Sequence, residues 1–157
     1  MAGKARGVPS KRLTPISRGD GIEVRRSRLH GLGVFATAPF KPGDVIERCP
    51  VLVIDPEDAD SLASGSLYGH VYDWGEGHAA VALGYGSLYN HDPVPNAEYS
   101  ASDDGEELVV KAKAVIQPGD EILVDYTGGG QIELWFDPRP ARPARATGSA
   151  SRSRLRR

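Results

Sequence analysis

The 157-residue chain lacks several features that define large protein classes. It has one cysteine, Cys49, so it has no intrachain disulfide and no cysteine-rich zinc site, which indicates a reducing compartment. Its four histidines lack close ligand spacing, which argues against a structural metal. It has no run of about 18 apolar residues and no apolar signal core. These absences predict a cytoplasmic or nuclear protein that is not secreted, spans no membrane and holds no metal.

Glycine and proline are abundant, with 19 and 12 residues, while 39% of the chain is hydrophobic. This composition is typical of a β-rich fold with many turns, and the length suits one domain. No alternation of strands and helices is present, which argues against a parallel α/β fold. Period-two patterns and turn residues predict a short helix over 56–63 and strands over 22–26, 45–47, 51–54, 79–83, 97–100, 107–115 and 121–126. Pro50 is expected to separate the second and third of these strands.

The net charge of −2 hides a strong asymmetry along the chain. Residues 29–137 carry nineteen acidic and four basic side chains, a net charge of −15. Residues 1–18 and 138–157 are basic and are predicted to be disordered, which leaves residues 19–137 as the folded domain. An acidic body attracts basic proteins or peptides, although the charge is also explained by solubility alone. The basic ends could contact nucleic acid only weakly and without sequence preference.

The segment Leu29–Ala36 contains the pattern G-x-G-x-x-A of dinucleotide-binding loops. That motif requires a buried strand before it and a helix after it. Here the preceding residues are rich in arginine, and Pro39 and Pro42 follow too early for a helix. We therefore expect the glycines to serve a tight turn or a close approach of the backbone to a ligand.

The segment from Leu88 to Ala97, LYNHDPVPNA, combines two asparagines, a histidine and two prolines. The prolines fix φ and remove two backbone donors, so the segment is predicted to be a rigid loop. Loops with amide and imidazole groups on a β scaffold are common carriers of function. The alternative is an ordinary surface turn rich in Asn, Asp and Pro.

Three stretches together resemble the signature motifs of the SET domain: residues 29–36, the run N-H-x-x-x-P-N from Asn90, and PGDEILVDY ending at Tyr126. The resemblance covers about residues 20–137 and is closest to the compact bacterial or viral versions. It implies a mainly β, β-clip fold with a C-terminal pseudoknot and one or two short helices. It also implies a protein-lysine N-methyltransferase that uses S-adenosylmethionine and acts on a basic protein, as histone-like substrates are.

The resemblance also implies roles for individual residues. Tyr126 matches the catalytic tyrosine, whose hydroxyl is expected where the lysine nitrogen meets the methyl group. The cofactor is expected to contact the backbone of His30, Gly31, Leu32 and Gly33, the side chain of Asn90 and the backbone of His91. The walls of the lysine channel or the cofactor pocket are expected among the aromatics Tyr72, Tyr85, Trp135 and Phe136, for which ordinary core packing is the alternative.

Two departures and two alternatives accompany this interpretation. Asp92 stands where the family most often has serine, and the cysteine-rich segment of larger members is missing, so Trp135 and Phe136 are expected to supply a lid. One alternative is a non-catalytic β-clip module that binds basic peptides, but such a module needs no hydroxyl at the channel. The other is a nucleic-acid-associated protein that uses its basic ends. The oligomeric state stays open, a homodimer included.

Overall fold

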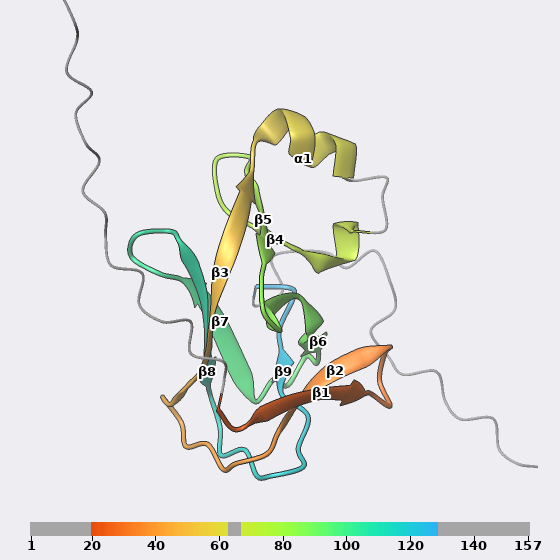
Figure 1. Ribbon diagram of the computed structural model, residues 1–157, viewed down its shortest axis with the longest axis vertical. Coiled ribbons are helices and arrows are strands. Elements are labelled where there is room, and N and C mark those ends of the chain that lie inside the picture. Colours follow the sequence, from red (N-terminus) through yellow and green to blue (C-terminus); the bar gives the residue numbers. More distant parts are fainter. Residues whose placement is uncertain (1–19, 63–66, 129–157) are drawn as a thin grey trace, which may run out of the picture.

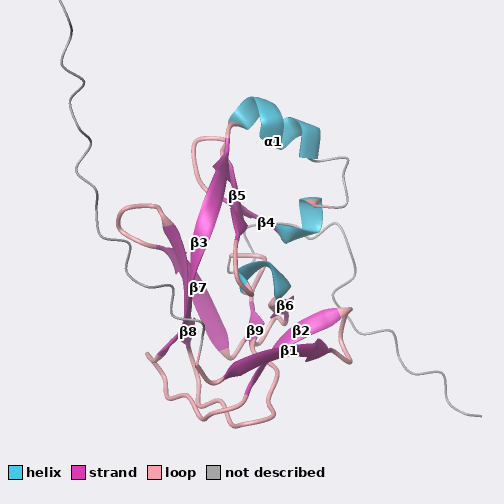
Figure 2. Ribbon diagram, viewed as in Figure 1, coloured by secondary structure: helices cyan, strands magenta, loops and turns pink. Residues whose placement is uncertain are grey.

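The computed structural model describes residues 20–62 and 67–128. The predicted basic segments 1–18 and 138–157, and the ends of the predicted domain, lie outside these residues. Short strands dominate (Figures 1 and 2), and two 3₁₀ turns span Tyr68–His70 and Gly86–Leu88. The elements are β1 Ile22–Arg26, β2 Leu32–Ala36, β3 Val45–Ile54, α1 Pro56–Leu62, β4 Val71–Asp73, β5 Ala79–Ala82, β6 Asn90–His91, β7 Ala97–Ala101, β8 Glu107–Ala112 and β9 Leu123–Val124.

The largest sheet has the strand order β4-β5-β3-β8-β7, with antiparallel pairing throughout. Its longest strand, β3, pairs with β8 over Val45–Pro50 and with β5 over Val51–Ile54. The prediction that Pro50 breaks the strand was wrong. Pro50 lies where β3 changes partner, so its missing N–H is not needed by the ladder, and its carbonyl accepts a hydrogen bond from the Leu83 N–H (2.8 Å).

The hydrophobic core lies between this sheet, the β1–β2 hairpin and the segment that leads into β9. The side chains of Val34, Ile116, Ile122 and Val124 are fully buried there. These residues come from both ends of the described chain, so the core joins the first hairpin to the last strand.

The last described segment is held from two sides, which is the arrangement of a pseudoknot. Towards the first hairpin, the Ile122 N–H donates to Val34 O and the Ala36 N–H donates to Asp120 O. On the other side, β9 pairs in parallel with β6, with Asn90 opposite Leu123. Figure 1 shows β6 and β9 between the β1–β2 hairpin and the large sheet. This topology confirms the predicted mainly β fold with a threaded C-terminal segment.

The ladder in this segment is shorter than the predicted strand over 121–126. Only Leu123–Val124 forms β9, and several backbone donors in and around it bind partners outside the β6–β9 ladder. The Leu123 N–H donates to the side chain of Asn96, and the Tyr126 N–H donates to the ring of His91. The sequence pattern identified the buried face of the segment correctly, since Ile122 and Val124 are buried and Tyr126 is half-buried.

No helix in the described part of the chain is long and apolar enough to cross a membrane. Within residues 20–62 and 67–128, no three His, Cys, Asp or Glu side chains gather as a metal-ligand set. Cys49 is buried and free. Burial, followed by the neighbouring Glu47, raises the pKa of its thiol, so the thiol is held in its unreactive protonated form.

Candidate functional site

Asn90 joins the first hairpin to the last segment. Its Nδ2 donates to His30 O (3.1 Å), to Leu32 O (3.0 Å) and to Glu121 Oε1 (2.7 Å). Three acceptors around one nitrogen fix which end of the amide is the donor. The opposite atom, Oδ1, accepts no hydrogen bond from the described residues, so it is left as an acceptor for a ligand.

Gly33 lies directly under this amide. A Cβ at Gly33 would come within 2.2 Å of Glu121 Oε1 and 2.9 Å of Asn90 Nδ2. Glycine is needed here because the backbone of β2 passes beneath two side chains. Gly31 serves the other expected purpose, a tight turn, with a φ of 48°. The side chain of Leu32 is 49% exposed, and only its carbonyl takes part.

Glu121 and Asn96 are two residues for which the sequence analysis gave no role. Glu121 also accepts a hydrogen bond from the Ser27 hydroxyl (2.8 Å), so its carboxylate ties the first loop to Asn90. Asn96 donates to Glu121 O and accepts from the Leu123 N–H, both at 2.8 Å. The signal was their position within the two motifs, Asn96 closing N-H-x-x-x-P-N and Glu121 inside PGDEILVDY.

His91 positions Tyr126 through its ring. The Tyr126 N–H donates to His91 Nδ1 (3.0 Å), which places the proton of the neutral ring on Nε2. Asp125 Oδ1 is 3.7 Å from the same nitrogen, which is beyond hydrogen-bond distance. The two rings lie 5.4 Å apart between centroids. The side chain of His91 therefore has a structural task in addition to the backbone contact predicted for it.

The Tyr126 hydroxyl donates a hydrogen bond to the carbonyl of Tyr89. Burial, with a contribution from Tyr99, raises the pKa of Tyr126 to about 12. The group is thus a protonated hydroxyl at neutral pH, which can donate its proton to the Tyr89 carbonyl.

The side chain of Tyr89 is held by a buried carboxylate. Glu47, which is 7% exposed, accepts hydrogen bonds from the Tyr89 hydroxyl (2.7 Å) and from the Tyr85 N–H (3.0 Å). These bonds fix the backbone between Tyr85 and Tyr89. Because the Tyr89 carbonyl belongs to this segment, Glu47 helps to position the partner of the Tyr126 hydroxyl.

The predicted wall residues fall into three groups. Tyr72 packs edge-on against Tyr99 (4.9 Å between centroids), and its hydroxyl donates to Gly86 O. Tyr85 is 37% exposed, and the ring contacts among the described residues do not include it. Trp135 and Phe136 lie outside the described residues. Tyr99 contributes an aromatic ring that the sequence analysis did not name.

Asp92 uses its carboxylate locally. Its Oδ1 accepts a hydrogen bond from the Val94 N–H (2.8 Å), which stabilises the turn at Pro93.

Comparisons with known proteins identify the family of the chain. The family model of the SET domain matches residues 31–127. A curated relative, the H3 lysine-37-specific histone-lysine N-methyltransferase of Schizosaccharomyces pombe, is 28% identical over 125 residues. That alignment covers 79% of this chain and 82% of the relative.

Two solved structures give the same picture. A Plasmodium falciparum protein described as a histone methyltransferase has a TM-score of 0.58 and 32% identity, and the match covers 73% of this chain and 96% of the other. A chain from the apo ctPRC2 complex with mutated Ezh2 has a TM-score of 0.57 and 17% identity. This second match covers 69% of this chain and 15% of the other, and it supports the fold alone.

The chain therefore belongs to the SET domain family and is a protein-lysine methyltransferase.

Proposed function

We propose that this methyltransferase binds S-adenosylmethionine beside Gly33 and Asn90 and transfers its methyl group to a lysine of a basic protein, such as a histone. The observation that carries the proposal is the connection between Asn90 and Tyr126. Asn90 and His91 are adjacent in β6, and the His91 ring holds the backbone of Tyr126. A methyl donor at Asn90 and an amine at Tyr126 would therefore be positioned by one short, buried strand.

The residues present fit the cofactor. The free Oδ1 of Asn90 is an acceptor for its ammonium group, and a hydrogen bond of this kind is strengthened by the charge. The bare backbone at Gly33 allows the close approach that a bound ligand needs. When bound, S-adenosylmethionine supplies an electrophilic methyl group on a sulfonium.

The chain has to position the amine and keep it neutral. A free lysine has a pKa near about 10.4, and burial among aromatic rings lowers that value because it disfavours the charged form. The oxygens of the Tyr126 hydroxyl and the Tyr89 carbonyl are acceptors for the N–H groups of the neutral amine, which would orient it and leave its lone pair for in-line attack. Since positioning is the main task, no protein nucleophile is required.

The proposed substrate class is supported by charge and by a relative. The net charge of −15 over residues 29–137 attracts basic proteins. The S. pombe relative acts on histone H3, as its name states. Both point to a lysine-rich and arginine-rich substrate.

The test is methyl transfer from labelled S-adenosylmethionine to core histones, with Tyr126→Phe as the variant. The change removes one oxygen and keeps the ring. We expect transfer to fall about 100-fold or more, the scale of losing one positioned catalytic group. The dissociation constant for S-adenosylmethionine, obtained from thermal shifts at several concentrations, should stay within about twofold of the wild-type value. Wild-type transfer by a folded Tyr126→Phe variant would rule out the catalytic assignment.

The wild-type protein also tests the cofactor assignment. A ligand that binds only the folded state raises the melting temperature with its concentration. A melting temperature that does not change when millimolar S-adenosylmethionine is added would contradict the proposed cofactor site.

A further inference from the structure

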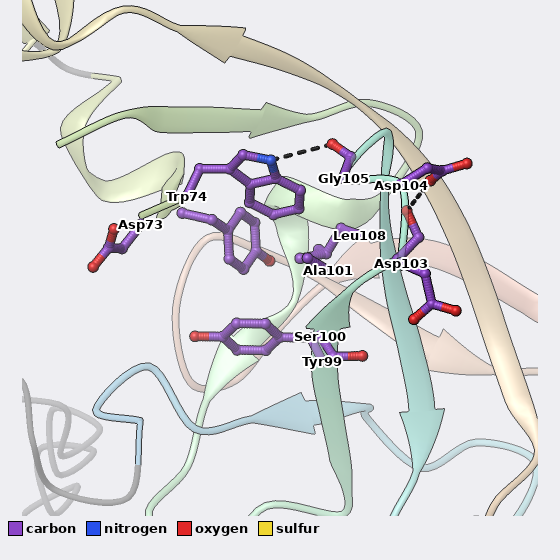
Figure 3. A pocket seen from close by; sticks show the side chains of 11 residues that line it. Asp73, Trp74, Tyr99, Ser100, Ala101, Asp103, Asp104, Gly105 and Leu108 are labelled. Atoms are coloured by element: carbon purple, nitrogen blue, oxygen red, sulfur yellow. Dashed lines mark hydrogen bonds between the residues drawn. The ribbon is translucent and has the colours of Figure 1, made fainter. Parts of the chain in front are cut away.

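A cavity of about 430 Å³ opens between β4 and the turn that joins β7 to β8. Its floor contains the aromatic rings of Tyr72, Trp74 and Tyr99. The Trp74 indole N–H donates to Gly105 O (3.2 Å), so the ring is fixed against the turn. Figure 3 shows the carboxylates of Asp73 and Asp103 on opposite sides of these rings. The size lies in the range of ligand pockets, about 300–1,000 Å³.

Two carboxylates of this aromatic–acidic cavity, those of Asp73 and Asp103, meet no basic side chain among the described residues that line it. Asp103 is exposed and has no hydrogen bond or ion pair within the described residues. Asp73 accepts only the local Gly75 N–H (2.9 Å) among those residues. A second cavity at the same hairpin shares Asp103 with the first, but it has no aromatic side chain and contains the basic Arg48 and Lys111, and its Glu107 is paired with Arg48 at 2.9 Å.

The cavity adjoins the site of methyl transfer. Tyr72 lines it and also donates its hydroxyl to Gly86 O, in the 3₁₀ turn that leads to Tyr89 and Asn90. Burial first, then the nearby Tyr126 and Tyr99, raises the pKa of Tyr72. The pKa of Tyr99 is raised by burial and by carboxylates that include Asp125 and Asp73. Tyr99 thus lies between the Tyr126 segment and the cavity.

We propose that the aromatic–acidic cavity binds an arginine side chain of the protein substrate, close in sequence to the lysine that is methylated. The combination of aromatic faces with the exposed carboxylates of Asp73 and Asp103 fits a guanidinium better than an ammonium. A guanidinium is planar and weakly hydrated, stacks on aromatic rings, and binds carboxylates through two parallel N–H groups. This inference rests on the proposed function, because it takes the target lysine to lie at Tyr126.

The experiment uses the full chain and short acetylated peptides. Each peptide has one central lysine in an alanine–glycine background, with a single arginine moved through about four positions on either side. A matched set replaces arginine by citrulline, which is isosteric and neutral. Binding is followed by fluorescence anisotropy and by the indole N–H signal of Trp74, assigned with Trp74→Phe, and methyl transfer is measured on the same samples.

The variants separate local from overall charge. Asp73→Asn combined with Asp103→Asn removes two carboxylates from the cavity and keeps an oxygen for the Gly75 N–H. Glu57→Gln combined with Asp58→Asn removes the same charge from the exposed face of α1, away from the cavity. We expect one arginine position at which citrulline weakens binding about tenfold in wild type and in the α1 variant, but has little effect in the cavity variant.

Several outcomes would overturn the arginine site. These are an arginine effect that survives in the cavity variant, equal losses in both variants, a Trp74 signal that does not move, or failure of every arginine peptide to bind. A peptide with trimethyllysine in place of arginine is also tested, because aromatic cages take quaternary ammonium groups. Tighter binding of the trimethyllysine peptide than of the arginine peptide would show that the cavity binds a methylated lysine instead. Arginine-dependent binding without methyl transfer would leave the cavity assignment standing and refute the proposed function.

Discussion

The two sides of the site are built in opposite ways. On the proposed cofactor side, Asn90, Asn96 and Glu121 are connected with each other and with the backbone at Leu32 and Leu123 by hydrogen bonds across three separate segments. On the side of the aromatic–acidic cavity, the rings are fixed, but the carboxylates of Asp73 and Asp103 lie exposed at its edge. One side consists of side chains that are hydrogen-bonded to one another and to the backbone. The other consists of fixed aromatic rings with exposed carboxylates beside them.

The difference matches what each side is proposed to bind. The cofactor is always the same molecule, so a network that is satisfied before binding loses nothing by being rigid. A protein substrate presents a flexible peptide, and exposed charges act on it over a distance of about 8–10 Å without requiring one geometry. We therefore expect substitutions in the network to affect folding and the cofactor together, and substitutions at the cavity to affect only the substrate.

The largest effect is expected from Gly33→Ala. The new Cβ would lie 2.2 Å from Glu121 Oε1, so the carboxylate must move away and release Asn90. The loss of a charged hydrogen bond that orients Asn90 should weaken cofactor affinity by about 10- to 100-fold. Isothermal titration with S-adenosylmethionine measures the change. Leu32→Ala is the control, because its side chain points to solvent, and unchanged affinity in Gly33→Ala would contradict the network.

A smaller effect, on stability, should separate Asn96→Ala from Asp103→Asn. Asn96→Ala removes the partners of Glu121 O and the Leu123 N–H, and should lower the free energy of unfolding by about 2 kcal/mol. Asp103→Asn changes an exposed side chain and should lower it by less than about 0.5 kcal/mol. Urea unfolding of both variants gives the comparison. Equal losses of unfolding free energy in the two variants would mean that the hydrogen-bonded side contributes no more to stability than the cavity side.

Alkaline pH provides a third test. The pKa values of Tyr72, Tyr89, Tyr99 and Tyr126 are all raised, mainly by burial, that of Tyr126 to about 12. Below about pH 10 the tyrosines are protonated in both states, so their contribution to stability is fully present. Above that pH the unfolded chain ionises first, and stability falls by up to about 1.4 kcal/mol per pH unit for each tyrosine. Urea unfolding at several pH values measures how the free energy of unfolding falls with pH. Tyr126→Phe is the control, and its free energy of unfolding should fall less steeply.

The smallest effect is a difference in salt response. The KM for a basic peptide should rise several-fold between low and high salt, because salt screens the attraction to the acidic body. The KM for S-adenosylmethionine should change little, since the network holds it by short, partly buried contacts. Steady-state kinetics with each substrate varied in turn gives both values. A KM for the peptide that does not change with salt would mean that the net charge of −15 serves only solubility.

The sequence predicted what local patterns and motifs encode. The short helix, the hairpin over Ala97–Ala112 and the buried face of Ile122 and Val124 follow from turn residues and alternation. The role of the glycines also followed, because G-x-G without a helix leaves only tight turns and close approaches. Pro50 was misjudged because a strand that changes partner tolerates proline, and nothing local shows such a change.

The network itself could not be predicted, because it depends on long-range contacts. Asn90 was expected to face a ligand, and its three protein partners come from residues 30–32 and 121. The sequence analysis gave no role to Glu47, because only the fold brings its carboxylate to the Tyr89 hydroxyl. The aromatic–acidic cavity combines β4 with a turn about thirty residues later in the chain, and a pairing of that kind leaves no pattern in the sequence.

The parallel pairing of β6 with β9 also has a consequence for protein synthesis. As the chain leaves the ribosome, β6 emerges long before β9, so Asn90 and His91 must wait for their partners. A nascent chain that ends before Gln117 lacks Glu121, the two-residue partner strand and Tyr126 together. Such a chain contains Asn90 and His91 but lacks the residues that hold them and the proposed catalytic tyrosine, so we expect no methyl transfer until the threaded segment has been translated and docked.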